Sequence, residues 1–452
     1  MESNKIFEVG YGRVDVTPDY PVHMAGSAAN RISTEVLDPL YITCIAFRQE
    51  GETFLVFTMD FVGAYGEFVR PLRKTISKAT GLEESHIILN ATHTHSSVSV
   101  RNDKLTGIAR YVKDCDVWAV AAAKAALEDL AAAQVRFGSA PTKGMAWVRH
   151  YKVADGTYAG ANYGSFKPGI VGHASDAYEE LQVIRFVREA SGKKDVVLVN
   201  FPAHATFNQS GTALSADFPG PFRAYIARHT DTLVAYFIAA AGDQVPNSRV
   251  PEERFSTDYR VYGEELGRIA VACMETLTQP ETPALGFDFR IFEGRSNKED
   301  MHLLPAAKEV EAIWMQVGGR GTPEGKKAAK EHGFSSVYEV TAILNREKFE
   351  ETRSLELKAL SFGRVSMIFA PYEMFGQSGH RIKTGSPYDM TFVASCSYDH
   401  AGYLPSELGC RLRCYEAQIT KFAYGTADEL VGEYVDMLKK LSLPAASEVT
   451  AQ

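Results

Sequence analysis

The sequence predicts an α/β fold in which layered, mixed β-sheets are flanked by helices. The first observation is a series of short β-rich apolar runs, each followed by polar or small residues. The second is a set of intervening segments whose apolar residues recur at helical spacing. Strands and helices that alternate along a chain are typical of layered α/β domains.

Several of the apolar runs are apolar at consecutive positions rather than at alternate ones. This pattern favours strands covered on both faces, because a strand with one solvated face alternates apolar and polar residues. In chain order the predicted strands are Tyr41–Phe47, Phe54–Met59, His86–Leu89, Val196–Phe201, Leu233–Ile238, Val365–Ala370 and Met390–Ala394.

The predicted helices lie between these strands. Asp116–Ala133 is rich in alanine, which has the highest helix propensity, and its apolar residues follow helical spacing. Three further segments have the same spacing: Pro221–His229, Tyr259–Leu277 and Ala427–Leu441. The stretch 297–350 is more charged, has helical patterns and interrupts the recurrence of strands. It predicts a helical insertion or lid.

Composition and charge exclude several classes of protein. The chain has 452 residues, of which 45% are apolar and 23% charged, which is typical of a globular protein rather than a disordered one. Its net charge of −8 argues against a protein that coats nucleic acid. No apolar run reaches the ~18–20 residues of a membrane span. The N-terminus resembles no secretion signal, and the six cysteines are scattered, so we expect a cytoplasmic location.

Four predicted strands run directly into residues that can bind a metal. The side chains that follow them are, in chain order, His93 with His95, then His204, then Glu373, then Tyr403. In open α/β sheets, ligand sites form outside the carboxyl ends of strands, because loops from separate strands converge there. The sequence therefore predicts a metal site at the C-terminal ends of strands.

His93 and His95 are two residues apart, a spacing that puts both side chains on one face of an extended segment. Both can be ligands, or one can be a ligand beside an acid/base group. His204 and Glu373 add an imidazole and a carboxylate, the usual nitrogen and oxygen ligands of a catalytic zinc site. Such a site keeps an open position for water and lowers its pKa to about 7 in favourable cases.

Six motifs, in order and with matching spacing, resemble the neutral/alkaline (non-lysosomal) ceramidase family. Val9–Pro18 is similar to the family's opening segment, and Asn90–Ser96 to its Thr-His-Thr-His segment. The remaining similar segments are Phe201–Ala205, Ala370–Phe375, Gly402–Pro405 and Cys414–Glu416. The resemblance covers nearly the whole chain. It implies a divergent, bacterial-type member with one large catalytic domain over residues 1–445.

The resemblance implies a zinc amidase and assigns roles to particular residues. The Zn²⁺ ligands would be His93, His204, Glu373 and Tyr403. His95 would act beside the metal in proton transfer, Arg149 would lie near the substrate, and Tyr415 would point at the reacting carbonyl.

The chain also departs from the family pattern. Val245 stands where ceramidases carry a serine that helps to handle the substrate, and 97–100 lacks the family's Gly-Pro-Gly-Gly. The sequence stops where ceramidases continue into a β-sandwich domain. These departures argue against ceramide itself and leave the metal site intact. Asp243 and Asn247 are expected to line the pocket, and Asp217 to lie in a rim loop that contacts the substrate.

The leading hypothesis is a zinc-dependent hydrolase of an amide or ester bond in a small polar substrate. One alternative is a metal-dependent lyase or isomerase acting on a sugar or polyol. Another is an inactive, metal-retaining binding protein, as the loss of serine at Val245 would suggest. A serine hydrolase using Ser96 is disfavoured because the chain has no Gly-x-Ser-x-Gly turn. The expected partner is a small molecule, with neither nucleic acid nor an integral membrane association, and the oligomeric state stays open.

Overall fold

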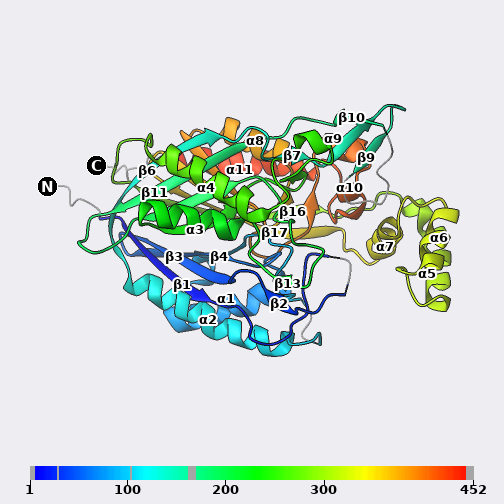
Figure 1. The fold of residues 1–452 in the computed structure, drawn as a ribbon, viewed down its shortest axis with the longest axis horizontal. Coiled ribbons are helices and arrows are strands. Elements are labelled where there is room, and N and C mark those ends of the chain that lie inside the picture. The colour runs from blue at the N-terminus through cyan, green and yellow to red at the C-terminus, as the bar shows by residue number, and fades with distance from the viewer. Residues whose placement is uncertain (1–5, 28–29, 102–103, 161–168, 444–452) are drawn as a thin grey trace, which may run out of the picture.

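A curled, mixed sheet of eight strands forms the centre of the computed structural model, which describes residues 6–27, 30–101, 104–160 and 169–443 (Figure 1). Its order is β14-β12-β11-β6-β1-β3-β4-β5. The strands are β1 (Glu8–Asp15), β3 (Tyr41–Gln49), β4 (Glu52–Met59), β5 (Ile87–Ala91), β6 (Ala131–Pro141), β11 (Glu180–Arg188), β12 (Val196–Phe201) and β14 (Leu233–Ile238). Neighbours β4 and β5, and β12 and β14, run parallel, whereas the other pairs are antiparallel.

The two halves of this sheet face each other. Strands β1 and β6 pair only at Glu8↔Ala132 and Val9↔Ala131, so the sheet bends at this narrow joint. Across the fold, Thr58 Oγ1 donates a hydrogen bond of 2.6 Å to the carbonyl oxygen of Tyr236, joining β4 to β14. The carboxyl ends of β5, β12 and β14 are thereby brought near one another.

A second, four-stranded sheet has the order β16-β17-β18-β20. Its strands are β16 (Leu285–Arg295), β17 (Thr352–Phe362), β18 (Val365–Phe369) and β20 (Met390–Ala394). Backbone and side-chain hydrogen bonds tie β20 to the first sheet, from Ser395 N to Ile238 O at 3.0 Å and from Asn200 Nδ2 to Val393 O at 3.1 Å. Four phenylalanine rings pack where the sheets meet: Phe7, Phe47, Phe186 and Phe362.

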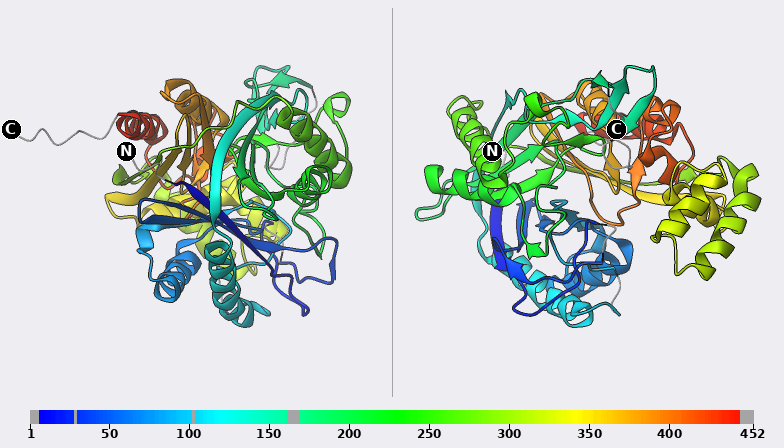
Figure 2. Two further views of the ribbon diagram at one scale, coloured as in Figure 1. Left: turned by 90° about the vertical axis from the view of Figure 1, so that its left-hand side faces the viewer. Right: turned by 45° about the vertical axis from the view of Figure 1, so that its right-hand side comes forward.

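Three pairs of helices cover the outer faces of the sheets (Figure 2). One pair, α1 (Gly66–Thr80) and α2 (Ile108–Glu128), covers the β1–β5 half. The second pair, α3 (Pro219–Thr230) and α4 (Tyr259–Met274), covers the β6–β14 half. The third, α8 (Gly376–Gly385) and α11 (Thr426–Ser442), covers the four-stranded sheet. None of the described helices is both long and apolar enough to cross a membrane.

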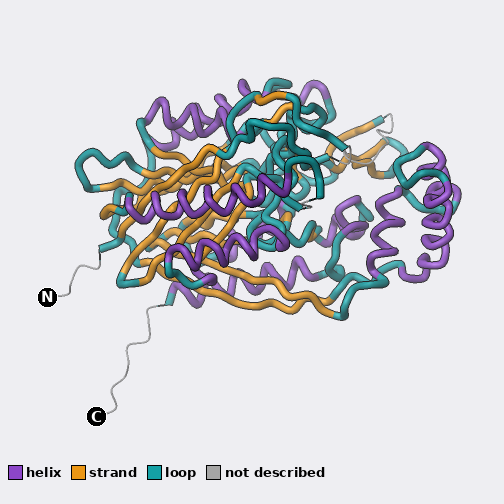
Figure 3. Tube along the Cα trace, turned by 90° about the horizontal axis from the view of Figure 1, so that it is seen from below, coloured by secondary structure: helices purple, strands orange, loops and turns teal. Residues whose placement is uncertain are grey.

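Three helices between β16 and β17 form a separate layer, away from the sheets (Figures 1 and 3). They are α5 (Leu304–Gln316), preceded by a 3₁₀ turn at Met301–Leu303, α6 (Pro323–Glu331) and α7 (Val337–Arg346). The side chains of Thr322 and Ser336 cap α6 and α7 by accepting backbone N–H groups, as helix N-caps do. The helices bury a small core of their own around Trp314 and Ile343.

Short elements complete the loops that connect the strands and helices. They are β2 (Glu35–Val36), β7 (Trp147–Val148), β8 (His150–Val153), β9 (Tyr158–Gly160), β10 (Ile170–His173), β13 (Ala213–Leu214), β15 (Gln244–Val245), β19 (Glu373–Met374), β21 (Tyr403–Leu404), α9 (Glu407–Arg411), α10 (Tyr415–Ile419) and 3₁₀ turns at Glu84–His86 and Pro251–Glu253.

The predicted fold class is confirmed, since mixed sheets are layered between helices. Each predicted strand is present within about two residues, a usual uncertainty for sequence-based boundaries. One predicted helix is wrong at both ends, because α2 begins at Ile108 rather than at Asp116. Helix α2 stops at Glu128 and Ala131–Ala133 begin β6, where burial alternates residue by residue. Alanine's helix propensity is overridden there by pairing with β11 and β1.

Candidate metal centre

Loops at four strand ends deliver the predicted ligands to one place. His93 follows β5, and His204 follows β12. Glu373 and Tyr403 lie in β19 and β21, which follow β18 and β20 and pair in parallel with Glu373 opposite Tyr403. Paired residues of adjacent strands project to the same face, so this pairing sets the carboxylate beside the phenol.

The imidazoles converge on the Glu373 carboxylate. Glu373 Oε2 lies 3.2 Å from His93 Nε2 and 3.1 Å from His204 Nε2. His95 Nε2 lies 3.2 Å from His93 Nε2. One ligand atom from each of the three histidines lies within 4.8 Å of the others. His93, His204 and Glu373 are buried, whereas His95 is half-buried at the mouth of the cluster.

In each of the three rings, Nδ1 is hydrogen-bonded to a backbone carbonyl oxygen. The distances are 2.5 Å from His93 Nδ1 to Val62 O, 2.7 Å from His95 Nδ1 to Gly26 O and 3.0 Å from His204 Nδ1 to Gln244 O. A carbonyl can only accept, so every Nδ1 carries the proton. In a neutral ring, Nε2 then presents a lone pair. This arrangement is the one that orients metal-ligating histidines in proteins.

The three Nε2 lone pairs and the buried carboxylate face one centre. They repel one another unless a cation or a proton lies between them. The His93–His95 contact sets two such acceptors 3.2 Å apart. A divalent cation removes the repulsion, and imidazole and carboxylate are ligands that zinc accepts. The donor set therefore fits a divalent metal.

The protonation states favour the lone-pair form at two of the rings. Burial, and then His93 and His204, hold the pKa of His95 well below its usual value. Burial, Arg149 and His93 lower the pKa of His204 to about 4. Burial alone would raise the pKa of Glu373, but His93 and His204 hold it well below its usual range. His93 differs, because Cys396 and Glu373 outweigh burial and raise its pKa.

The backbone around His93 is not the extended segment that the His-x-His spacing suggested. His93 adopts a left-handed conformation with φ of 67°. Such a conformation costs a non-glycine residue on the order of 1 kcal/mol and tends to persist where surrounding contacts enforce it. The rings of His93 and His95 still meet, 4.8 Å apart at 84°. Gly26 lies so close to this turn that a Cβ atom there would be 2.4 Å from His95 Cα.

Tyr403 and Arg149 border the cluster together. The Arg149 guanidinium lies 5.4 Å from the Tyr403 ring centre, and Arg149 Nη1 lies 3.4 Å from His204 Nε2. Arg149 Nη2 forms a buried ion pair of 2.5 Å with Glu416 Oε1. The Tyr415 ring lies 5.9 Å from that of Tyr403. Burial and Glu373 raise the pKa of Tyr403 well above its usual value, while Arg149 partly offsets them.

Comparisons with known proteins bear on the fold. No protein-family model matches the sequence. No curated protein matches it. Among solved structures, neutral ceramidase from Pseudomonas aeruginosa superposes with a TM-score of 0.71 at 15% identity, over 98% of this chain and 76% of that one. The chain has the ceramidase fold. A ceramidase complexed with C2 agrees, with a TM-score of 0.69 at 14% identity over 99% and 77% of the two chains.

The family resemblance inferred from six short motifs is thus confirmed for the fold. At this level of identity the likeness establishes the fold alone.

Two pockets meet at His95 in this ceramidase fold. The larger, here called the histidine pocket, has a volume of about 930 Å³ and contains His93, Glu373, Tyr403 and Tyr415 in its wall. The smaller, of about 300 Å³, contains Arg149, Val245 and Asn247. The predicted ligands and acid/base groups therefore surround connected space rather than a closed core.

The remaining predicted binding residues are placed differently. Asn247 lines the smaller pocket, as expected, and its Nδ2 donates to Ser256 O. Asp243 is buried, and its Oδ1 accepts the backbone N–H of Gly376, which ties the β15 loop to α8. Asp217 is fully buried in a turn and lines neither pocket. Its carboxylate accepts backbone N–H groups of Asn208 and Phe218 instead.

The buried Asp217 should make stability depend on pH. Burial raises its pKa from 3.8 to about 7, so between these values the folded chain holds a proton that the unfolded chain has lost. Stability from this group is complete below about pH 4 and declines as pH rises through about 7. Relative to Asp217→Asn, we expect the wild-type free energy of unfolding to fall by roughly 2–4 kcal/mol over this window. Urea unfolding of wild type and Asp217→Asn at both ends of this pH window measures how the difference in their stability changes with pH. A stability difference that does not change with pH would contradict a raised pKa at Asp217.

The side chains of His400 and Cys396, which lie beyond the predicted set, also contact the cluster. His400 Nε2 lies 3.3 Å from Glu373 Oε1, so it holds the oxygen that faces away from His93 and His204. Cys396 Sγ lies 3.5 Å from His93 Nδ1. Both follow β20 in the segment that leads to Tyr403. Their position after a strand was visible in the sequence, but their contact with Glu373 and His93 depends on the loop's path.

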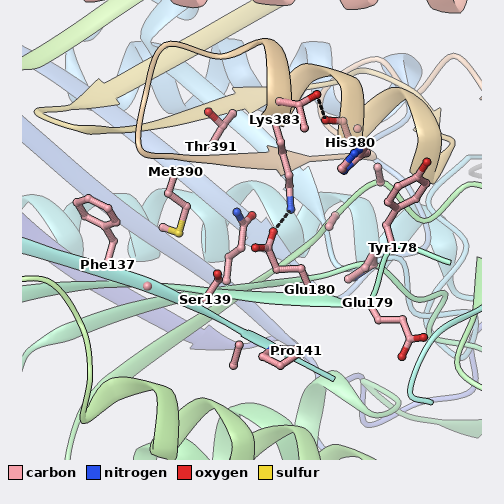
Figure 4. A pocket seen from close by; sticks show the side chains of 18 of the residues that line it. Phe137, Ser139, Pro141, Tyr178, Glu179, Glu180, His380, Lys383, Met390 and Thr391 are labelled. Carbon is pink, nitrogen blue, oxygen red and sulfur yellow. Dashed lines mark hydrogen bonds and ion pairs between the residues drawn. The ribbon is translucent and has the colours of Figure 1, made fainter. Parts of the chain in front are cut away.

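A different pocket of about 840 Å³ lies between the β6–β11 strands and α8 (Figure 4). Its prominent charges are already paired, since Lys383 Nζ lies 3.1 Å from Glu180 Oε2. It shares no lining residue with the histidine pocket. A second possible metal cluster consists of His150, Cys414 and Glu416. There the Glu416 carboxylate is already neutralised by Arg149, which leaves less need for a cation.

Proposed function

We propose that this protein is a zinc-dependent hydrolase of an amide or ester bond in a small polar substrate. The observation that carries the proposal is the orientation of three imidazoles, whose Nδ1 atoms are fixed on backbone carbonyls while their Nε2 atoms face a common centre. The ceramidase fold supports it, because the fold's solved examples include a neutral ceramidase.

His93, His204, Glu373 and Tyr403 are the proposed metal ligands. A divalent cation held there supplies Lewis-acid activation of water and of a carbonyl group. The chain's own residues would do the rest. Tyr415 and Arg149 would stabilise negative charge on the carbonyl oxygen, and loss of one such donor typically costs ~10²–10³ in rate. His95, at the mouth of the cluster, would move a proton between water and the leaving group.

His95→Ala is expected to slow turnover by about 10²–10⁴-fold, the usual contribution of a general acid/base group, while metal content stays near the wild-type value. The reason is geometric, since His93 and His204 both contact Glu373 Oε2, whereas His95 Nε2 lies against His93 Nε2. Metal content and kcat/KM are measured on the same sample. Loss of metal in this variant would make His95 a ligand.

The reaction type is tested by stripping the purified protein with a chelator, restoring zinc and screening N-acyl and O-acyl compounds. Zinc-dependent release of a new acid together with an amine or alcohol supports hydrolysis. Conversion of a sugar or polyol without addition of water would instead establish a lyase or isomerase. A zinc-loaded protein that turns over no compound of either kind would favour the inactive binding protein that Val245 suggested.

A further inference from the structure

The wall of the histidine pocket is charged rather than apolar. Among the described residues, six cationic and three acidic side chains line it, and its aliphatic side chains are Val62 and Ile419 alone. The whole chain, in contrast, carries a net charge of −8. Pockets that take apolar ligands are lined mainly by apolar and aromatic residues. The pocket therefore has an excess of positive charge in a chain whose net charge is negative, which points to an anionic ligand.

Three of the cations form no close ion pair. They are Arg101, Arg353 and Lys421, here called the cationic rim, and none forms an ion pair with the part of the chain that the structure describes. By comparison, Arg70 in the same wall pairs with Asp399. The rim residues come from the loop after β5, the start of β17 and the loop between α10 and α11. Separate segments of the fold thus place like charges together.

Aromatic rings hold the two arginines in position. The Arg101 guanidinium lies 4.5 Å from the ring centre of Tyr65, and that of Arg353 lies 5.0 Å from the ring centre of Phe349. Stacking of this kind orients a guanidinium without using its N–H donors. Both groups therefore keep their N–H donors available for a forked oxygen anion.

Lys421 is half-buried, and the charges of both arginines act on it. Burial, then Arg353 and Arg101, lower the pKa of Lys421, and Glu67 and Asp399 offset only part of this effect. A hydrogen bond of 2.9 Å from Asn297 N to Lys421 O fixes its loop beside the base of the helical insertion. Proximity of like charges is unfavourable unless an anion is bound between them.

We propose that the substrate carries a carboxylate or phosphate group that binds to Arg101, Arg353 and Lys421 while the scissile bond lies at the histidine cluster. This inference rests on the proposed hydrolase function and specifies its substrate class. Carboxylate and phosphate share the oxygen geometry that arginine binds in bidentate fashion. The helical insertion contributes to the same pocket through Arg320 and Tyr338, so it would lie over the bound anion.

The test compares zinc-loaded wild type with the double variant Arg353→Met/Lys421→Met on substrate pairs that differ in one charged group. One pair is an N-acetyl amino acid and its carboxamide, and the other is phosphorylated and free N-acetylethanolamine. For wild type we expect kcat/KM to favour an anionic member by about 10- to 100-fold, from charge-assisted hydrogen bonds. The preferred pair identifies the anion. Arg381→Met is the matched control, because Arg381 is exposed and pairs with Asp428 on α11.

The double variant should lose the preference while keeping turnover of the neutral members. Equal use of both members by wild type, or a preference that survives in the double variant, would overturn the inference and leave the hydrolase proposal standing. If no acyl compound is turned over, the hydrolase proposal fails, and calorimetric titration of glutarate and inorganic phosphate tests the cationic rim alone. Binding that the wild type shows and the double variant loses would support an anion site at the rim. Equal binding by the two proteins would reject the anion site as well. Arg101→Met, at an exposed residue, repeats the test if the double variant misfolds.

Discussion

His204→Ala is expected to remove the bound metal and abolish turnover together. His204 Nε2 and His93 Nε2 meet at the same oxygen of Glu373, so the substitution removes one donor of a compact set. Changes to residues that merely orient ligands cost 10- to 100-fold in metal affinity, and loss of a direct donor should cost more than about 100-fold. Elemental analysis of the dialysed protein should fall from about one zinc per chain to near zero.

Cys414→Ala is the control for this experiment. Cys414 belongs to the second possible metal cluster, with His150 and Glu416, and not to the set around Glu373. We expect this variant to keep its zinc and its activity. The opposite pattern, with zinc kept in His204→Ala and lost in Cys414→Ala, would move the metal centre to the second cluster.

Asp60→Ala is expected to destabilise the fold by about 3–5 kcal/mol, the usual cost of removing one partner of a buried ion pair. The fully buried Asp60 carboxylate accepts two hydrogen bonds from Arg223, of 3.0 and 2.8 Å. It also accepts from the backbone of Tyr41 and from Thr92 Oγ1, next to His93. The variant leaves a buried guanidinium uncompensated, and urea unfolding measures the loss.

Two comparisons make the Asp60 result specific. Lys308→Met breaks an ion pair with Glu347 in which both side chains are about half exposed, and exposed pairs contribute about 0–1 kcal/mol. Removing both partners, as Asp60→Ala with Arg223→Met, should recover part of the stability because no buried charge is left alone. A cost for Asp60→Ala no larger than for Lys308→Met would show that the buried pair is not what anchors this loop.

Strand ends were the part of the site that the sequence could predict. Consecutive apolar residues mark β5, β12, β18 and β20, and polar residues after strand ends commonly converge on one site. That reasoning placed His93, His204, Glu373 and Tyr403 together, as the structure does. The four strands belong to two sheets, so here the convergence comes from the curl of the first sheet and from the hydrogen bonds that join β20 to it. The helical stretch between residues 297 and 350 was likewise visible from its periodicity.

The remaining features depend on tertiary contacts that carry no sequence signal. The carbonyl groups of Val62, Gly26 and Gln244 fix the imidazoles, and any residue type could supply a carbonyl. The left-handed backbone at His93 is set by surrounding hydrogen bonds rather than by its residue type. Asp217 was expected in a rim loop, but its turn folds inward. Strands β1, β6, β11, β16 and β17 were not among the predicted strands. In β16 apolar residues alternate with polar ones, a pattern that differs from the continuous apolar runs of the predicted strands.

X-ray absorption at the zinc edge of the zinc-loaded protein tests the central claim most directly. The account predicts a first coordination shell of nitrogen and oxygen only, at about 2.0–2.2 Å, with the outer-shell scattering of imidazole rings. A sulfur atom at about 2.3 Å would place the ion on Cys414 or Cys396 instead. Such a shell, or a protein that holds no zinc in a defined site, would contradict a centre built from His93, His204, Glu373 and Tyr403.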